Sequence, residues 1–161
     1  MSCIATSYIT NEADYAVVLA LAKRIHKEQK GWWIFKKNVE IGRTEFESAF
    51  NSKFNELTTL NYSGYTMLEI EGIAQNDKHY AIPENNNSSK DLELIFGYGG
   101  YILRNGKMIT VPSDDYIAEH LRGKGQDYRA DAIGAVRSAY EFYNKAAGAV
   151  KNGSVVLIGL Y

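Results

Sequence analysis

The sequence predicts a single α+β domain in which a mixed or largely antiparallel sheet packs against about three helices. The chain has 161 residues, 45% of them hydrophobic, which is enough for one core without disulfides or metals. Within residues 92–112, two apolar runs flank Asn105-Gly106, a pattern typical of a β-hairpin with a two-residue turn. Residues 154–161 are almost wholly apolar, which predicts a strand buried on both faces at the centre of the sheet.

The first third of the chain predicts a strand, a helix and a second strand. Residues 3–9 form the first strand, and Asn11 is a suitable N-cap for a helix that extends to about residue 30. Gly31 would end that helix. Residues 32–41, which open with Trp-Trp-Ile-Phe, favour a strand whose aromatic side chains pack on both faces of the sheet or reach a helix.

A capping box at residues 44–47 then predicts a second helix, with Phe46, Phe50, Phe54 and Leu57 as a core stripe. Residues 65–82 indicate a second hairpin. The polar stretch 84–90 predicts a mobile surface loop within the same domain, which spans residues 1–161.

Two more helices are expected toward the C-terminus. Ser113 is a suitable N-cap for a short helix that ends at Gly123. A long helix capped by Asp127 follows, and its apolar positions recur on one side as far as Val150. Its many alanines would let it lie close to a sheet.

Composition excludes several classes of protein. The net charge of −1 removes the simplest electrostatic case for nucleic-acid binding. Cys3 is the only cysteine, so we expect a reducing compartment and no intramolecular disulfide. No secretory signal is visible and no run approaches the length of a membrane span, so we expect a cytoplasmic protein without a membrane partner.

No motif in the chain identifies a reaction. His26, His79 and His120 show no metal-ligand spacing, and nothing in the sequence provides Cys3 with an activating neighbour. We therefore expect no metal and no cofactor. His120 is a weak candidate for a catalytic acid or base.

The densest basic group lies near residues 120–129 and provides the candidate ligand site. Residues 123–125, Gly-Lys-Gly, resemble part of a phosphate loop, but the required spacing is missing and a plain turn is the better interpretation. Three tyrosines and three cations could nevertheless bind an acidic or phosphorylated ligand: Tyr98, Tyr101, Arg122, Lys124, Tyr128 and Arg129. We predict that the segment around Tyr98 and the turn holding Lys124 border one concavity.

Two functional hypotheses remain open. The first is stoichiometric protein–protein binding by a small protein of the inhibitor or immunity-protein type. It rests on the lack of a catalytic motif, on 12 tyrosines, a residue favoured at protein interfaces, and on acidic stretches that could match a basic partner. The alternative is a small hydrolase or transferase acting on a nucleotide or nucleic acid, with His120 as acid or base and Arg104, Arg122 or Lys124 on phosphate.

Overall fold

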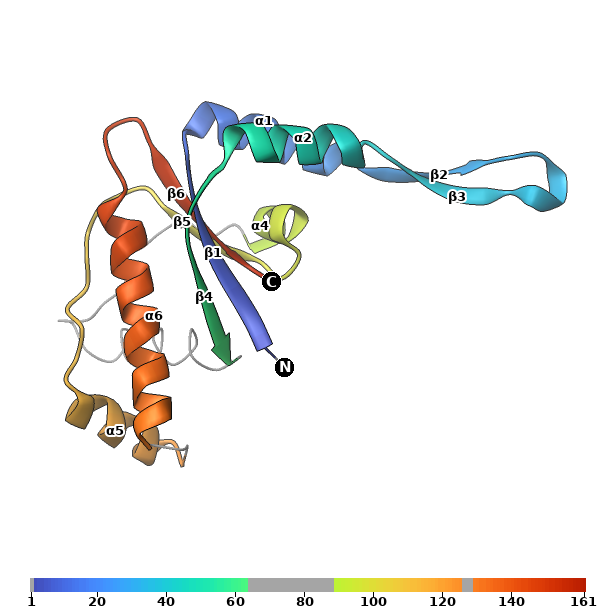
Figure 1. The fold of residues 1–161 in the computed structure, drawn as a ribbon. Coiled ribbons are helices and arrows are strands. Elements are labelled where there is room, and N and C mark those ends of the chain that lie inside the picture. Colours follow the sequence, from blue (N-terminus) through green and yellow to red (C-terminus); the bar gives the residue numbers. More distant parts are fainter. Residues whose placement is uncertain (1, 64–88, 126–128) are drawn as a thin grey trace.

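The fold is α+β, as predicted, and its centre is a four-stranded antiparallel sheet (Figure 1). The computed structural model describes residues 2–63, 89–125 and 129–161. The strand order is β4-β1-β6-β5. The strands are β1 (Ser2–Thr10), β4 (Asn55–Ser63), β5 (Gly100–Leu103) and β6 (Val155–Leu160). The predicted N-terminal and C-terminal strands are confirmed, and both lie in the interior of this sheet.

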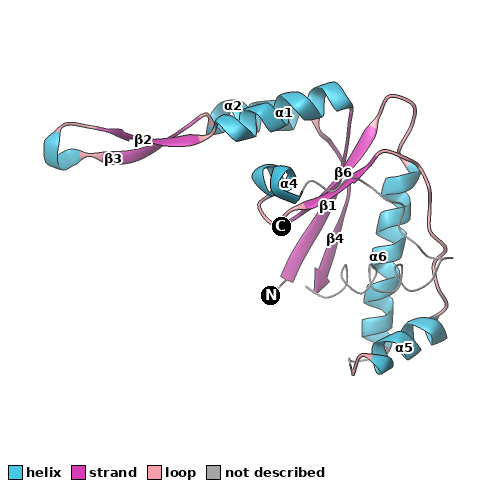
Figure 2. Ribbon diagram, turned by 180° about the vertical axis from the view of Figure 1, so that it is seen from behind, coloured by secondary structure: helices cyan, strands magenta, loops and turns pink. Residues whose placement is uncertain are grey.

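Helices cover both faces of the sheet, because the side chains of β6 alternate between two apolar cores. Val156 and Ile158 belong to one core, whereas Leu157 belongs to the other. The first core is covered by α5 (Asp114–Gly123) and α6 (Ala130–Gly148). The second is covered by α1 (Glu12–Arg24), α2 (Arg43–Lys53) and α4 (Ser89–Phe96) (Figure 2). The described residues thus contain five α-helices.

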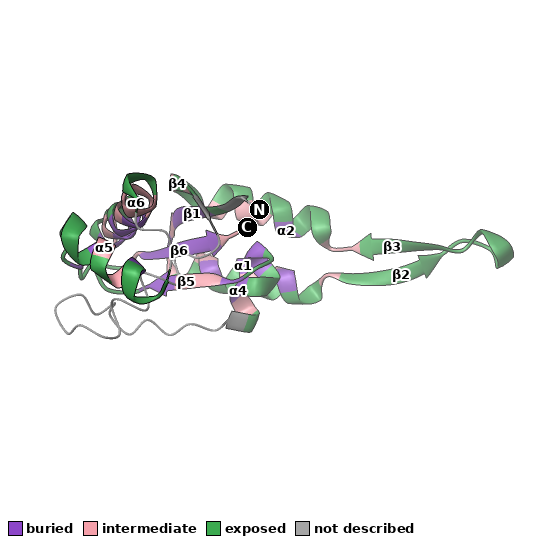
Figure 3. Cartoon of the chain, turned by 90° about the horizontal axis from the view of Figure 1, so that it is seen from below, coloured by how far each residue is buried: buried purple, intermediate pink, exposed green. Residues whose placement is uncertain are grey.

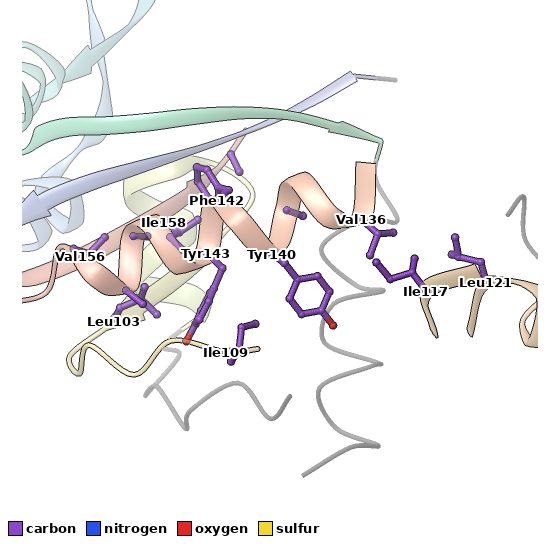
Figure 4. Close-up of a cluster of buried hydrophobic side chains, with 14 residues drawn as sticks. Leu103, Ile109, Ile117, Leu121, Val136, Tyr140, Phe142, Tyr143, Val156 and Ile158 are labelled. Carbon is purple, nitrogen blue, oxygen red and sulfur yellow. The ribbon is translucent and has the colours of Figure 1, made fainter. Parts of the chain in front are cut away.

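The core beneath α6 consists of the apolar side of that long helix, as its spacing predicts. Val136, Tyr140 and Tyr143 are buried there (Figure 4). Ile117 and Leu121 of α5 pack against the same cluster. None of the helices in the described parts of the chain has the length and apolar content that crossing a bilayer requires.

The opposite core is rich in aromatic rings. Tyr8 stacks on Phe96 with 5.7 Å between ring centroids and meets Phe50 edge-on at 5.1 Å. Phe46 and Phe54 are also buried, so the prediction that this phenylalanine stripe is core is confirmed for them. Offset and edge-to-face pairs of this kind stabilise a core by about 0.5–1.5 kcal/mol each beyond simple burial.

The predicted helix caps are confirmed at two of the three positions that the structure describes. The side chain of Asn11 accepts a hydrogen bond from the Asp14 N–H at 2.8 Å, and Ser113 accepts one from the Tyr116 N–H at 3.3 Å. The capping box at residues 44–47 is wrong. α2 begins two residues earlier than a Thr44 cap requires, at Arg43, and its N-cap is Gly42 with φ of 93°, so Thr44 is already inside the helix.

The predicted hairpin across Asn105-Gly106 is also wrong. Only the start of its first arm belongs to helix α4. The end of that arm is strand β5, but β5 pairs with β6, so no strand from residues 108–112 lies beside it. The side chain of Asn144 on α6 instead bonds both backbone groups of Ile109, accepting from N–H and donating to C=O at 2.8 Å each. Gly106 lacks the positive φ that a type I′ turn requires.

The first predicted helix ends at Arg24, six residues earlier than expected, and the chain leaves the body there as a β-arm. We use this name for residues 26–41, which comprise β2 (His26–Lys30), the short 3₁₀ helix η1 (Trp33–Phe35) and β3 (Lys37–Ile41). β2 and β3 pair antiparallel as a separate two-stranded sheet. The β-arm connects α1 to α2 and projects away from the sheet (Figure 1).

Two predictions fall outside the described residues, the hairpin at 65–82 and the polar loop as far as residue 88. Ser89 and Lys90, the last residues of that predicted loop, begin α4. The predicted Asp127 cap is wrong, because α6 begins at Ala130 and its N-cap is Arg129.

Candidate functional site

The end of the β-arm carries four consecutive large apolar residues that are exposed to water. Trp32, Trp33, Ile34 and Phe35 are 86%, 81%, 82% and 76% exposed, and we call these four residues the aromatic tip. Figure 3 shows the β-arm exposed over its whole length beyond the two helices that carry it. Burying a large apolar side chain is favourable by about 1.5–3 kcal/mol, so leaving four of them in contact with water is unfavourable. Contiguous apolar surface of this kind marks interaction sites on proteins.

Backbone geometry holds the aromatic tip in a defined shape. Gly31 has φ of 122°, and a side chain there would overlap the carbonyl oxygen of Phe35. The Phe35 N–H donates to the Trp32 carbonyl at 3.1 Å and closes the turn. Trp33 has φ of 57°, the only positive value at a non-glycine residue in the described chain. That conformation is strained for a bulky residue, and such strain is concentrated at functional sites.

The two indoles form a recess with a neighbouring cation. The ring centroids of Trp32 and Trp33 lie 6.5 Å apart at an interplanar angle of 58°. Together with Lys36 they line a recess of about 450 Å³. The recess therefore offers two aromatic walls and one ammonium group, a combination suited to an apolar group that carries an acid.

Polar contacts fix the base of the β-arm to the helices. His26 contacts the Arg24 carbonyl through Nδ1 at 2.8 Å and the Glu28 carboxylate through Nε2 at 2.9 Å. Arg43 of α2 donates to Glu40 of β3 at 2.8 Å, and its guanidinium lies 5.7 Å from the Phe46 ring centroid. The β-arm thus leaves the body in a direction set at both strands.

These contacts shift the ionisation of the groups at the base. The pKa of His26 is raised, first by its bond to the Arg24 carbonyl and then by Glu28. The pKa of Glu28 is lowered by its bond to His26, and that of Glu40 is lowered by its bond to Arg43. Both carboxylates of the β-arm are therefore held ionised by partners at its base.

The predicted ligand residues come from different layers of the fold. His120 and Arg122 lie on α5, Lys124 is its C-cap and Arg129 is the N-cap of α6. Tyr101 lies on β5 against the core beneath α6, whereas Tyr98 lies in the turn between α4 and β5 and is exposed. Tyr128 is outside the described residues. None of these residues lines the recess at the aromatic tip or the smaller recess beside α2 and α4.

The candidate chemical groups also lie apart. His26 is at the base of the β-arm, His120 is on α5, and His79 is outside the described residues. Cys3 lies on β1, paired with Tyr62 of β4. Within the part of the chain that the structure describes, no three His, Cys, Asp or Glu residues are grouped as metal ligands would be.

A second, smaller recess lies on the body beside α2 and α4. It measures about 260 Å³, and Phe46, Phe50 and Tyr161 contribute its rings. The Tyr161 hydroxyl bonds the Tyr8 hydroxyl at 2.9 Å, and burial raises the pKa of Tyr161, so the phenol is neutral. Ligand pockets usually enclose about 300–1,000 Å³, so this recess is small for a binding site.

Sequence reasoning placed the aromatic tip in the sheet because a run of four large apolar residues is usually buried. The composition of β2 and β3, the strands on either side of the aromatic tip, does indicate that the tip is exposed. β2 and β3 contain only two apolar side chains, Val39 and Ile41, which are too few to form a core around them. Comparisons with models of protein families, with curated proteins and with solved structures found no match to this chain.

Proposed function

We propose that this protein acts by stoichiometric binding to a protein partner and that the aromatic tip of the β-arm is its main contact. The observation that carries the proposal is the exposure of four consecutive large apolar side chains at the end of a projecting arm. Buried aromatic anchors dominate the energy of protein interfaces, tryptophan above all. An inhibitor or immunity-type role is one form that such binding can take.

The position and strain of the aromatic tip support the same function. The five residue pairs of β2 and β3 hold it roughly 17 Å beyond the helices, at about 3.4 Å per residue. Nothing in the body's cores depends on these side chains, since none of them belongs to either cluster. A rigid aromatic tip loses less conformational entropy on binding, so the strained backbone at Trp33 can raise the affinity for a partner.

The test begins by identifying the partner. A photo-crosslinking amino acid at position 34 is introduced in the organism that encodes the chain, with the same amino acid at position 145 on α6 as the control site. The protein linked only from position 34 is purified. Its affinity for this chain and the molar ratio of the complex are then measured by calorimetry.

The decisive variant combines Trp32→Ser with Trp33→Asn, since asparagine tolerates the left-handed backbone at position 33. We expect a fixed molar ratio for the wild type and a loss of affinity of roughly 30-fold or more for the variant, because anchor residues contribute about 2 kcal/mol or more. The matched control, Gln29→Ser with Asn38→Ser, changes an opposed pair in the middle of the β-arm and should bind normally. Equal affinity of both variants would refute the role of the aromatic tip.

His120 separates binding from the enzymatic alternative. His120→Gln should leave affinity for the purified partner at the wild-type level, because α5 and the β-arm lie on different parts of the molecule (Figure 1). Loss of the biological effect by a variant that folds and binds normally would favour the hydrolase or transferase hypothesis instead.

A further inference from the structure

Three lysines surround the aromatic tip, and their only acidic influence in the described residues is at longer range, where the charge of Lys30 helps to lower the pKa of Glu28. Lys30, Lys36 and Lys37 are exposed, and no ion pair joins any of them to a carboxylate within the described ranges. We call these three residues the lysine collar. The two glutamates of the β-arm lie nearer its base, where Glu28 bonds His26 and Glu40 bonds Arg43. Positive charge is therefore unbalanced at the end that carries the aromatic tip.

The register of the β-arm concentrates this charge. Lys30 is directly opposite Lys37 on paired strands, an arrangement in which like charges destabilise a sheet. Lys36 lines the same recess as Trp32 and Trp33. A sequence that needed only a soluble arm would gain by placing a glutamate at one of these positions, so the collar favours an acidic counterpart.

We propose, on the basis of the function above, that the partner presents an apolar recess bordered by aspartate or glutamate carboxylates. The aromatic tip fills the apolar recess, and the lysine collar pairs with the carboxylates around it. One partner side chain lies in the recess that the indoles and Lys36 line, with its carboxylate on Lys36 and its methylene groups against the rings. Charge pairs around an apolar anchor raise the association rate and select the correct partner.

Other occupants fit the same observations less well. A second β-arm would bring one lysine collar against another. A bilayer imposes no shape, so it gains nothing from the strained, fixed geometry of Trp33. Hydrocarbon would also leave the open edges of a two-stranded ribbon unpaired, whereas a protein can bond them. Three cations are few for nucleic acid, whose affinity depends on many phosphate contacts.

The test uses charge reversal on the β-arm and a matched reversal on the body. The collar variant is Lys30→Glu, Lys36→Glu and Lys37→Glu. The body control is Lys90→Glu, Lys145→Glu and Lys151→Glu, three exposed lysines on or near α4 and α6 that produce the same change in net charge. Each is titrated against the partner captured from position 34 at two salt concentrations. At about 0.05 M salt the charges are weakly screened, and at about 0.5 M salt they are strongly screened.

We expect the collar variant to lose at least about tenfold in affinity at low salt and less at high salt, and the body control to change by no more than about twofold. Carbodiimide, which couples ammonium groups directly to carboxylates, should link Lys30, Lys36 or Lys37 to partner aspartate or glutamate. Equal losses in both variants, or links only elsewhere, would overturn the proposal.

The outcomes distinguish this inference from the function on which it rests. If the tryptophan variant loses binding while the collar variant keeps it, the aromatic tip is the contact and the acidic rim is wrong. If both variants bind normally, both proposals fail. Vesicles of phosphatidylcholine with about one fifth phosphatidylserine and single-stranded oligothymidine serve as the other probes. Binding of the wild type to either, more tightly than to the captured protein, would overturn the protein partner.

Discussion

Asn144 takes the place of a strand for the segment that follows β5. Its amide satisfies both the N–H and the C=O of Ile109, a buried residue that no neighbouring strand pairs. Unsatisfied backbone groups in such a position carry a large desolvation cost. One side chain on α6 therefore holds residues 104–112 against the core.

Replacing Asn144 by Ala should lower the free energy of unfolding by about 1–3 kcal/mol, because it leaves both groups of Ile109 without their partner. Urea unfolding followed by circular dichroism measures the change. Asn38→Ala, on the exposed β-arm, is the control and should leave the midpoint unmoved. Equal midpoints for the two variants would mean that water replaces the Asn144 amide without cost.

His26 should titrate above its ordinary pKa of about 6.5. Because the folded-state pKa is raised, the contacts of the imidazolium stabilise the base of the β-arm fully when the pH is below the ordinary pKa of histidine. That contribution is lost as the pH rises through the raised pKa. Nuclear magnetic resonance of the imidazole protons gives the value directly. Glu28→Gln should lower the pKa only in part, since the Arg24 carbonyl remains the larger cause.

At the scale of elements, sequence predicted correctly where local pattern and long-range packing agree. β6 is apolar throughout and is central, α6 has one apolar side and covers the sheet, and Asn11 and Ser113 cap helices. These features depend on burial period and on capping chemistry, which a short window of sequence contains.

The failures have a common physical cause, which is competition from distant segments. Asn105-Gly106 favours a hairpin, but β6 offers β5 a longer apolar partner, and Leu92, Ile95 and Phe96 bury one side of a helix at helical spacing. The aromatic tip could not be recognised as exposed until the β-arm was placed outside both cores.

Alanine substitutions at two glycines, one in β5 and one in α6, should have opposite effects on stability. In β5, a side chain at Gly100 would overlap the carbonyl oxygen of Ile158 on β6, so Gly100→Ala should destabilise the fold by about 1–3 kcal/mol. Gly134 lies inside α6 with open space around it, so Gly134→Ala should stabilise by about 0.5–1 kcal/mol. Opposite shifts in the urea midpoint are expected. A stable Gly100→Ala variant would show that β5 can move away from β6.

At the scale of the whole molecule, stability and binding are separated in space. Two cores lie on the two faces of one sheet, and every residue of the β-arm is exposed except Ile41, which is partly buried. An isolated two-stranded hairpin is marginally stable at best. The β-arm therefore depends on the helices at its base for its shape, whereas the body does not depend on the β-arm.

Replacing residues 26–41 by Asn-Gly should leave the body folded and remove binding. His26 and Ile41 are paired across the β-arm, and Gly42 lies beside Ile25, so a two-residue turn can connect α1 to α2. The free energy of unfolding should change by no more than about 1 kcal/mol, because the removed segment belongs to neither core. Urea unfolding checks the body, and calorimetry with the captured partner checks binding. A truncated chain that no longer folds would show that the β-arm contributes to the body. A truncated chain that folds and still binds would place the partner's contact on the body instead.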